Sequence, residues 1–225
     1  RIPNALQVGC FDTAFHQTMK EDKYLYALPY EWCDEYKARR FGAHGTSHKY
    51  VSMKANEILG KNDTKLITCH IGSGASVSAV VNGKCFDTSM GLTPNAGLVM
   101  GTRCGDIDAT ILPYMIRKGF SVDELDNKMN KKSGFLGISG KYSDARDIVN
   151  GCNNNDPKCI LARDLFVNRV VDYIAKYYFE MNGCDMIVFT AGLGEKSSYF
   201  REQIMNRLGI IGIYLNKDEN DKCFG

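Results

Sequence analysis

The sequence lacks three features that would place it at once in a large class of proteins. No apolar run approaches the length of a membrane-spanning helix. Residues 1–9 do not combine a charged segment with an apolar core, as a signal peptide would. The net charge is +2, from 28 Lys and Arg against 26 Asp and Glu, and the basic residues form no stripe that could follow a phosphate backbone. We therefore expect no nucleic-acid partner and no membrane association.

Paired cysteine motifs are also missing. The nine cysteines are odd in number and contain no C-x-x-C pair. Several lie in apolar segments, where a reduced thiol behaves as a small hydrophobic side chain. This pattern favours a cytoplasmic protein over a secreted, disulfide-bonded one.

What is present is an ordinary globular composition. The 225 residues are 44% hydrophobic and 24% charged, enough to bury a sizeable core in one large or two small domains. The chain does not begin with Met, and we expect it to be a fragment of a longer protein.

Hydrophobic periodicity predicts an α/β chain in the first half. We predict a strand near residues 5–11 and a helix that begins at residues 45–47 and ends at Gly60. The helix has one apolar face, which we expect to be buried: Val51, Ala55, Ile58 and Leu59.

Residues 65–89 predict three strands joined by two turns. A β-branched segment runs into His70 and a Gly-Ser-Gly turn, and a second apolar segment follows. Asn82-Gly83 then predicts a two-residue hairpin, because a type I′ turn needs positive φ at both central positions.

The second half is mostly helical by pattern. Ser121 and Glu124 form a capping box at the start of a helix that ends near residues 133–134. Residues 150–157 are polar and predict a loop. A long helix over residues 160–181 leads to a buried strand at residues 186–190. We expect a Gly-x-Gly turn at residues 191–195 and then a last helix, with Phe200, Ile204 and Leu208 on one face.

Two glycine-rich turns are candidate phosphate sites. In His70–Gly74, the glycines allow backbone N–H groups to point at an anion, and Ser73 and Ser76 add hydroxyl donors. The second turn contains Gly192 and Gly194 and precedes a helix, whose amino-terminal end favours anions. Each turn alone is also explained as a simple connection between elements, but two such turns in one α/β domain favour a nucleotide site. The first turn matches neither a P-loop nor a dinucleotide-binding fingerprint, because it lacks Gly-Lys-Ser/Thr and is followed by a strand.

Polar loops supply the other candidates. We expect Asp12 and His16 at the end of the first strand, where an acid can orient a nucleophile or hold a metal through water. His44 and His48 lie at a helix start, but residue 45 is glycine, so the H-E-x-x-H zinc motif is absent. The histidines could also be caps or packed rings.

Arg103 lies in a glycine-flanked loop. Its alternative role is a surface ion pair with Asp106 or Asp108, which would contribute little to stability.

Taken together, seven segments resemble the acetate kinase family, in the same order and at matching intervals: residues 11–18, 26–32, 44–51, 68–76, 87–91, 101–108 and 190–195. The resemblance covers essentially the whole chain. It implies an α/β fold with ribonuclease H-like duplicated domains, that of the acetate and sugar kinase, Hsp70 and actin superfamily, here truncated. Residues 1–40 would end the first domain and connect it to the second, and residues 41–225 would form most of the second, nucleotide-binding domain.

The resemblance also implies roles for individual residues. The catalytic residues would be Asp12, His44 and Arg103, with the last two holding the phosphoryl group in flight. ATP or ADP would contact three segments: His70, Ile71, Gly72, Ser73 and Gly74; Asp144, Ala145 and Arg146; and Gly192, Leu193, Gly194, Glu195 and Lys196. Ala43 and Pro94 would line the substrate pocket. Mg²⁺ or Mn²⁺ would assist, without a ligand in this chain unless Asp12 binds it through water, and the protein would be a homodimer.

The reaction implied is reversible transfer of the ATP γ-phosphoryl group to acetate. Charge stabilisation dominates such a reaction. Acetate is already ionised at neutral pH, so Asp12 is better explained as an orienting or metal-linked group than as a base.

Three positions depart from the family pattern. Ser73 replaces the usual asparagine of the phosphate loop, and Lys196 replaces an asparagine of the adenosine site. Ala43 replaces an aromatic residue beside the acetate methyl group, which favours propionate or butyrate as an alternative substrate.

Segments expected at both ends of the family fold have no counterpart here. We therefore expect residues 1–225 alone to be nearly inactive. A non-catalytic nucleotide-binding module is the alternative from another class, and a sugar kinase is disfavoured because no sugar-kinase motif is present.

Overall fold

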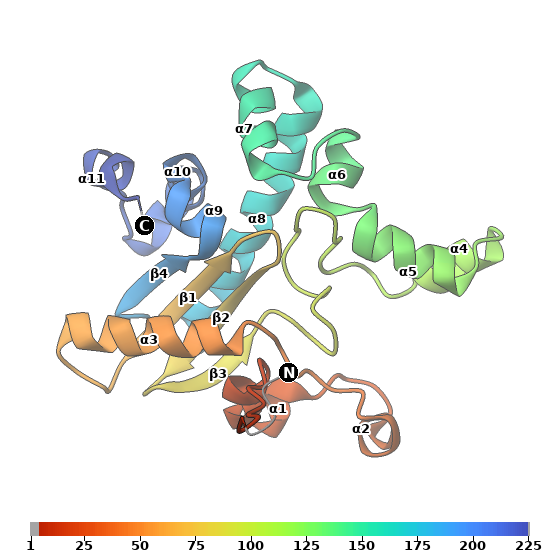
Figure 1. Ribbon diagram of the computed structural model, residues 1–225, viewed down its shortest axis with the longest axis horizontal. Coiled ribbons are helices and arrows are strands. Elements are labelled where there is room, and N and C mark those ends of the chain that lie inside the picture. Colours follow the sequence, from red (N-terminus) through yellow and green to blue (C-terminus); the bar gives the residue numbers. More distant parts are fainter. Residues whose placement is uncertain (1–4, 225) are drawn as a thin grey trace.

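The computed structural model describes residues 5–224 and is built around a mixed four-stranded sheet (Figure 1). Its strands are β1 (Lys65–Ile71), β2 (Ala75–Val81), β3 (Lys84–Thr88) and β4 (Met186–Thr190). The strand order is β3-β2-β1-β4, with β1–β2 and β2–β3 antiparallel and β1–β4 parallel. The strands predicted within residues 65–89 and at residues 186–190, the Asn-Gly hairpin and the α/β class are thereby confirmed.

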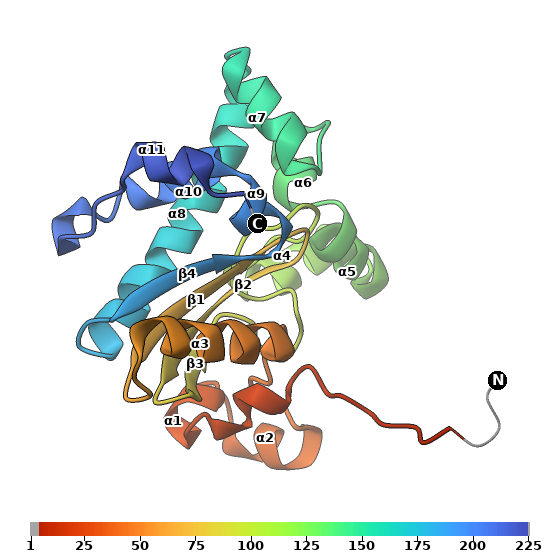
Figure 2. The same ribbon diagram turned by 60° about the vertical axis from the view of Figure 1, so that its left-hand side comes forward.

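Helices cover both faces of this sheet. The α-helices are α1 (Glu21–Tyr24), α2 (Tyr30–Tyr36), α3 (Gly45–Leu59), α4 (Ile111–Arg117), α5 (Val122–Lys131), α6 (Gly134–Ser139), α7 (Ala145–Asn153), α8 (Pro157–Glu180), α9 (Ala191–Lys196), α10 (Ser198–Met205) and α11 (Lys217–Lys222). Two 3-10 helices are η1 (Ala14–Thr18) and η2 (Gly209–Ile211). Helix α3 packs against β1 and β4 on one face, whereas α8 packs against β1 and β2 on the other (Figures 1 and 2).

Strand alternation sends two different kinds of side chain to these faces. Towards α8, Ile67, Cys69 and Ile71 of β1 join the main apolar core, which includes Phe166. Towards α3, the apolar contacts are confined to a small cluster around Leu66, Val80 and Ala55. The rest of the α3 face is polar, and this is where the histidines gather.

The polar face explains why the predicted buried face of α3 is partly wrong. The buried residues of the helix are Gly45, His48, Ser52 and Ala55, whereas Ile58 is 77% exposed. His48 packs over Thr68 of β1, and its ring is hydrogen-bonded to that hydroxyl at 2.7 Å. Hydrophobic periodicity cannot identify a helix face that is buried through polar partners.

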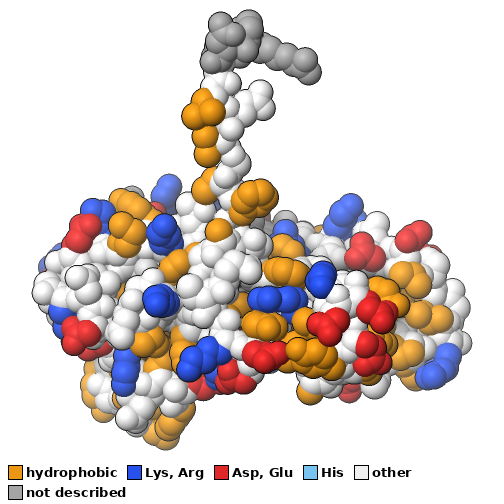
Figure 3. All heavy atoms as spheres, turned by 90° about the horizontal axis from the view of Figure 1, so that it is seen from below, with side chains coloured by type: hydrophobic (Ala, Val, Ile, Leu, Met, Phe, Trp, Pro, Cys, Tyr) orange, Lys and Arg blue, Asp and Glu red, His pale blue; other side chains and the backbone are white. Residues whose placement is uncertain are grey.

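The predicted first strand is also wrong. Residues 5–11 form no helix or strand and run as an arm away from the body (Figures 2 and 3). Leu6 is 89% exposed, Val8 80% and Phe11 76%. A strand requires a hydrogen-bonded neighbour, and within residues 5–224 no strand lies beside this segment. Asp12 and His16 therefore follow an arm and occupy a turn and η1.

In the second half, the predicted capping box is confirmed, whereas the predicted loop and the predicted open turn are wrong. In α5, the Ser121 hydroxyl accepts from the Glu124 N–H at 3.2 Å, and the Glu124 carboxylate accepts from the Ser121 N–H at 2.8 Å. The predicted loop at residues 150–157 is largely helical, because α7 continues to Asn153 and Asp156 caps α8. Residues 191–195 form α9 instead of an open turn.

All nine cysteines are free thiols. In residues 5–224, no helix combines the length and apolar character needed to cross a membrane.

Candidate active site

The carboxyl end of β1 meets the amino-terminal end of α3, and this junction holds the predicted catalytic residues. Asp12 caps α3, because its carboxylate accepts the N–H groups of His44 at 2.7 Å and Thr46 at 3.3 Å. A Cβ at Gly45 would lie 2.3 Å from the Asp12 carbonyl oxygen, so only glycine fits this approach. Burial works to raise the pKa of Asp12, but the N–H groups of His44 and Thr46 outweigh it and the pKa is lowered.

His44 is fixed at the start of α3 by its backbone and by its ring. Its φ is 59°, in the left-handed region, and its ring stacks on that of His70 with centroids 4.0 Å apart. His44 Nδ1 lies 2.8 Å from the Ser76 hydroxyl. Burial, with a further contribution from His70, lowers the pKa of His44 to about 4. His44 is therefore uncharged at neutral pH.

Arg103 converges on the same point from the loop after β3. A Cβ at Gly74 would lie 3.4 Å from both His44 Nε2 and Arg103 Nη1. Arg103 Nη1 also donates to the Pro94 carbonyl at 3.4 Å, and no ion pair of Arg103 with Asp106 or Asp108 is found in the described residues. The structure thus favours a cation held beside the glycine-rich turn over the surface-pair alternative.

The other two histidines are packed rings. His16 is fully buried; its Nε2–H donates to the Ala43 carbonyl at 2.9 Å, and its Nδ1 lies 3.1 Å from the Cys85 thiol. His48, also fully buried, bridges Thr68 and Ser76. For these two, the packed-ring alternative holds, and neither reaches the surface of the site.

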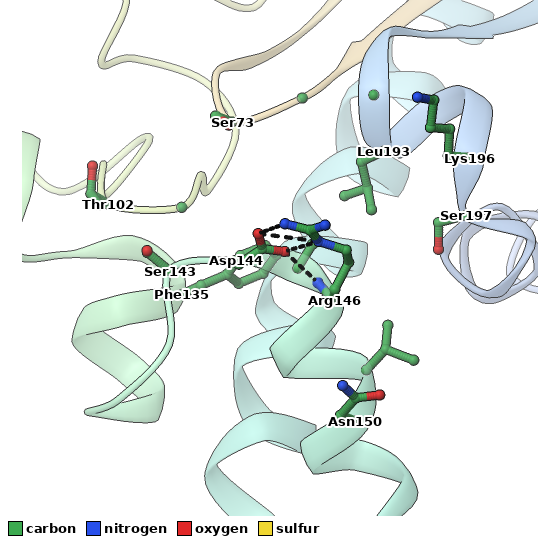
Figure 4. Close-up of a pocket in the computed structure, with 15 residues that line it drawn as sticks. Ser73, Thr102, Phe135, Ser143, Asp144, Arg146, Asn150, Leu193, Lys196 and Ser197 are labelled. Atoms are coloured by element: carbon green, nitrogen blue, oxygen red, sulfur yellow. Dashed lines mark hydrogen bonds and ion pairs between the residues drawn. The ribbon is translucent and has the colours of Figure 1, made fainter. Parts of the chain in front are cut away.

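A cavity of about 670 Å³ lies beside this junction, between the β1–β2 turn, α7 and α9. Its lining includes these predicted nucleotide residues: Gly72, Ser73, Asp144, Ala145, Arg146, Gly192, Leu193 and Lys196. Figure 4 shows Asp144 and Arg146 between Ser73 on one side and Leu193 with Lys196 on the other. Three segments far apart in the sequence therefore share one cavity, as the resemblance implies for a nucleotide site.

Five predicted nucleotide residues do not line this cavity. His70 lies beneath His44, and Gly74 faces His44 and Arg103. Ile71 belongs to the main core, and Gly194 packs against the backbone of Phe189. The Glu195 carboxylate accepts from the Thr190 hydroxyl and the Ala191 N–H, each at 3.0 Å, and so caps α9.

Sequence reasoning missed part of the cavity wall: Gly101, Thr102, Phe135, Ser143, Val149, Asn150 and Ser197. Gly101 and Thr102 begin a motif that was recognised for Arg103, and Ser143 adjoins Asp144. Phe135 and Val149 carry no signal of their own, because an apolar residue on a short helix looks the same whether it packs a core or a ligand.

Asp144 and Arg146 form a bidentate ion pair at the cavity wall. Arg146 Nη2 lies 2.6 Å from Asp144 Oδ2, and Arg146 Nε lies 3.0 Å from Asp144 Oδ1. Asp144 also caps α7 by accepting the Arg146 N–H at 2.8 Å. The Arg146 hydrogen bonds lower the pKa of Asp144 to about 2. The pair is a solvent-exposed polar edge of a cavity whose other walls include Phe135, Leu193 and Val149.

The histidine cluster predicts a pH-dependent stability. Burial lowers the pKa of each of the four histidines: His16, His44, His48 and His70. Below the unfolded value of 6.5, the unfolded chain binds more protons than the folded one, so stability falls as the pH falls. For the fully buried His48 alone, we expect the loss to steepen below that value and to approach about 1.4 kcal/mol per pH unit roughly one unit lower.

Urea unfolding between about pH 7.5 and 5.5 measures this slope. Carboxylates such as Asp12 have a pKa lowered from 3.8 and titrate below this window. A free energy of unfolding that stays constant or rises on acidification would contradict the prediction.

Comparison with known proteins agrees with the fold. The family model for the acetokinase family matches residues 1–225. The chain is 52% identical over 223 residues to the acetate kinase of Clostridioides difficile, covering 98% of this chain and 56% of that protein. The chain belongs to the acetokinase family.

Solved structures of acetate and propionate kinases have the same fold as this chain. The crystal structure of Porphyromonas gingivalis acetate kinase superposes with a TM-score of 0.92 at 44% identity, over 96% of this chain and 55% of that one. A propionate kinase from Francisella tularensis gives 0.91 at 45% identity, over 94% and 55%. The chain spans a little over half the length of these relatives.

Proposed function

We propose that the protein containing this chain is an acetate kinase, which reversibly transfers the γ-phosphoryl group of ATP to acetate. The observation that carries the proposal is the convergence of His44 Nε2 and Arg103 Nη1 beside Gly74, next to a cavity lined by the β1–β2 turn, α7 and α9. A phosphoryl group passing between two anions needs positioned donors and cations, which this arrangement supplies. Family membership supports the same reaction.

In this mechanism the adenosine part of ATP occupies the cavity, with Phe135 and Leu193 against the base. The phosphates extend towards the Gly72–Ser73 turn, where backbone N–H groups bind them. Arg103 and His44 hold the phosphoryl group as it moves, and acetate lies near Ala43 and Pro94. Acetate attacks as its carboxylate, so no residue has to remove a proton.

Asp12 is the residue of this chain that fits a metal-linked role. Residues 5–224 contain no group of three or more His, Cys, Asp or Glu side chains arranged to hold a metal ion. Mg²⁺ is, however, commonly held by one or two carboxylates, waters and substrate phosphates. The exposed Asp12 carboxylate accepts one N–H at each oxygen and keeps further lone pairs free for a metal-bound water. When bound, Mg²⁺ or Mn²⁺ neutralises charge on the phosphate oxygens.

A cytoplasmic location and a homodimer belong to the same proposal. The nine free thiols support a reducing compartment. The dimer, and the division into residues 1–40 and 41–225, rest on the resemblance to the family.

A hydroxamate assay of acyl-phosphate formation tests the function. The full-length protein should form acetyl phosphate from acetate, ATP and Mg²⁺, and a sugar should not compete. ATP binding without acyl-phosphate formation would contradict the kinase and favour the nucleotide-binding module instead.

Ala43 favours propionate kinase or butyrate kinase as the second candidate. Its side chain is small and only partly buried against the core, which leaves room for a longer acyl chain. We expect Ala43→Phe to lower the ratio of kcat/KM for propionate to that for acetate by about 10- to 200-fold, the range for one methylene in a pocket. Rates with acetate, propionate and butyrate measure it. An unchanged ratio would show that Ala43 does not set the acyl length.

A further inference from the structure

A chain of hydrogen bonds runs behind His44 into the buried, polar face between α3 and the sheet. His44 Nδ1 lies 2.8 Å from Ser76 Oγ, and the same oxygen lies 2.8 Å from His48 Nε2. His48 Nδ1 lies 2.7 Å from Thr68 Oγ1. Thr68, Ser76 and His48 are fully buried, so water does not compete for these bonds.

Only one side of His44 faces the site. Its Nδ1 is taken by Ser76, whereas Nε2 has no hydrogen-bond partner within residues 5–224 and lies 3.4 Å from the position of a Cβ on Gly74. An uncharged imidazole carries a proton on one nitrogen and a lone pair on the other. The tautomer of His44 therefore decides whether it offers a phosphoryl oxygen a donor or a repelling lone pair.

Ser76 links the tautomers of the two histidines. Its hydroxyl has one proton, so it donates to one ring and accepts from the other. If Ser76 donates to His44 Nδ1, His48 must donate from Nε2 to Ser76, and Thr68 must donate to His48 Nδ1. The reverse order would place the proton of His44 on Nδ1.

Little in the protein favours the reverse order. In that order Thr68 would donate to the Ser78 carbonyl, which lies 3.4 Å away, a long and weak hydrogen bond. An anion beside His44 Nε2, by contrast, strongly favours the order that presents an N–H. A protonated His48 would donate from both ring nitrogens and would no longer link the two tautomers. Burial, however, lowers the pKa of His48 well below the ordinary value.

We propose that Ser76 and His48 are positioning residues that hold His44 with its proton on Nε2, so that His44 donates to the transferring phosphoryl group. This proposal rests on the proposed function, in which His44 is a hydrogen-bond donor to the phosphoryl group. Ser76 and His48 would keep His44 in the tautomer that can donate. His70 contributes from the other side, since its ring stacks on His44 at 4.0 Å while its own Nδ1 is bonded to Ser47 at 2.8 Å. The stacking and the Ser76 hydrogen bond together orient the His44 ring.

The first test replaces Ser76 by alanine in the full-length protein. We expect kcat for acyl-phosphate formation to fall on the order of 10- to 100-fold, less than the loss of a donor outright, with the KM for ATP nearly unchanged. Ser78→Ala is the matched control, because Ser78 is an equally buried serine on the same strand whose hydroxyl bonds to Thr88 at 2.7 Å. Equal kcat values in Ser76→Ala and Ser78→Ala would overturn the proposal.

The second test observes the tautomer directly and needs no turnover. Long-range ¹H–¹⁵N correlation NMR of the histidine rings, with ADP and Mg²⁺ bound, should show His44 protonated on Nε2, and the signal lost in His44→Ala assigns it. In Ser76→Ala, Nδ1 loses its hydrogen-bond donor, so the share of His44 that is protonated on Nε2 should fall. A proton on Nδ1 in the unsubstituted protein, or an unchanged tautomer in Ser76→Ala, would overturn the inference even if the protein proves to be an active kinase.

A third comparison covers the case in which Ser76→Ala does not fold. The amide of His48→Gln can still donate to Ser76, whereas His48→Leu cannot. We expect a kcat about 2- to 10-fold higher for His48→Gln than for His48→Leu, as one neutral hydrogen bond is worth. An equal or higher kcat for His48→Leu would overturn the proposal.

Discussion

Replacing His44 by alanine is expected to lower kcat for acetyl-phosphate formation by about 10²- to 10³-fold, the usual loss for one preorganised donor at a transition state. The reason is the position of Nε2, which faces the point where Arg103 also converges, beside Gly74. Nucleotide affinity should be nearly unchanged, because His44 lies outside the lining of the 670 Å³ cavity. Steady-state kinetics and calorimetric titration with ATP measure the two quantities.

A control and a contrary result are both available. His44→Gln keeps a side-chain N–H and should recover part of the lost rate. If His44 had a purely structural role, kcat would be no higher in His44→Gln than in His44→Ala. A His44→Ala protein with kcat within about threefold of the original, far from the loss expected for such a donor, would contradict the role.

The second large effect concerns stability. Asp87 is 1% exposed and is paired with Lys176 Nζ at 2.7 Å and Arg40 Nη1 at 3.6 Å. Burial works to lower the pKa of Arg40, but Asp87 outweighs it and the pKa is raised. Asp87→Ala leaves Arg40 with no acidic partner in the described residues and Lys176 with only Glu180, at 3.9 Å. We expect a loss of about 3–5 kcal/mol in the free energy of unfolding, as for other broken buried pairs.

Urea unfolding with Asp172→Ala as the matched control measures this loss. Asp172 also lies near a cation, Arg169, at 3.9 Å, but its side chain is 64% exposed, so its removal should cost no more than about 1 kcal/mol. A similar loss in both variants would show that burial of the Asp87 cluster does not matter.

The Asp87 cluster bears on function too, because Arg40 also donates to the Thr88 carbonyl and so fixes the segment that leads to His44.

Local sequence signals predicted the elements whose cause is local. Asn82-Gly83 predicted the β2–β3 hairpin because the turn itself demands positive φ, and φ is 51° and 73° at these positions. The Ser121–Glu124 capping box predicted the start of α5 for the same reason. By contrast, residues 5–11 alternate like a strand, but whether they pair depends on a neighbour that the local pattern does not contain.

The residues of the site also fall into two groups, those that local sequence motifs identified and those that only tertiary packing brings together. The glycine-rich turns and the loop of Arg103 carry residue types that stand out in sequence, and the structure brings them together. His48 and Ser76 stood out singly in the sequence, but the Thr68–His48–Ser76 chain could not be predicted, because its members lie on two strands and a helix and meet only when α3 packs on the sheet. Phe135 and Val149 were missed for a similar reason, since the cavity exists only once α6, α7 and α9 are in place.

The most direct test of the account is ³¹P NMR of the full-length protein with ATP, Mg²⁺ and acetate, followed by the reverse mixture of acetyl phosphate, ADP and Mg²⁺. We expect an acyl-phosphate signal to grow as the γ-phosphate signal of ATP declines, and ATP to form in the reverse mixture. Inorganic phosphate as the only product, or unchanged spectra with ATP bound, would contradict phosphoryl transfer to a carboxylate at the His44–Arg103 site.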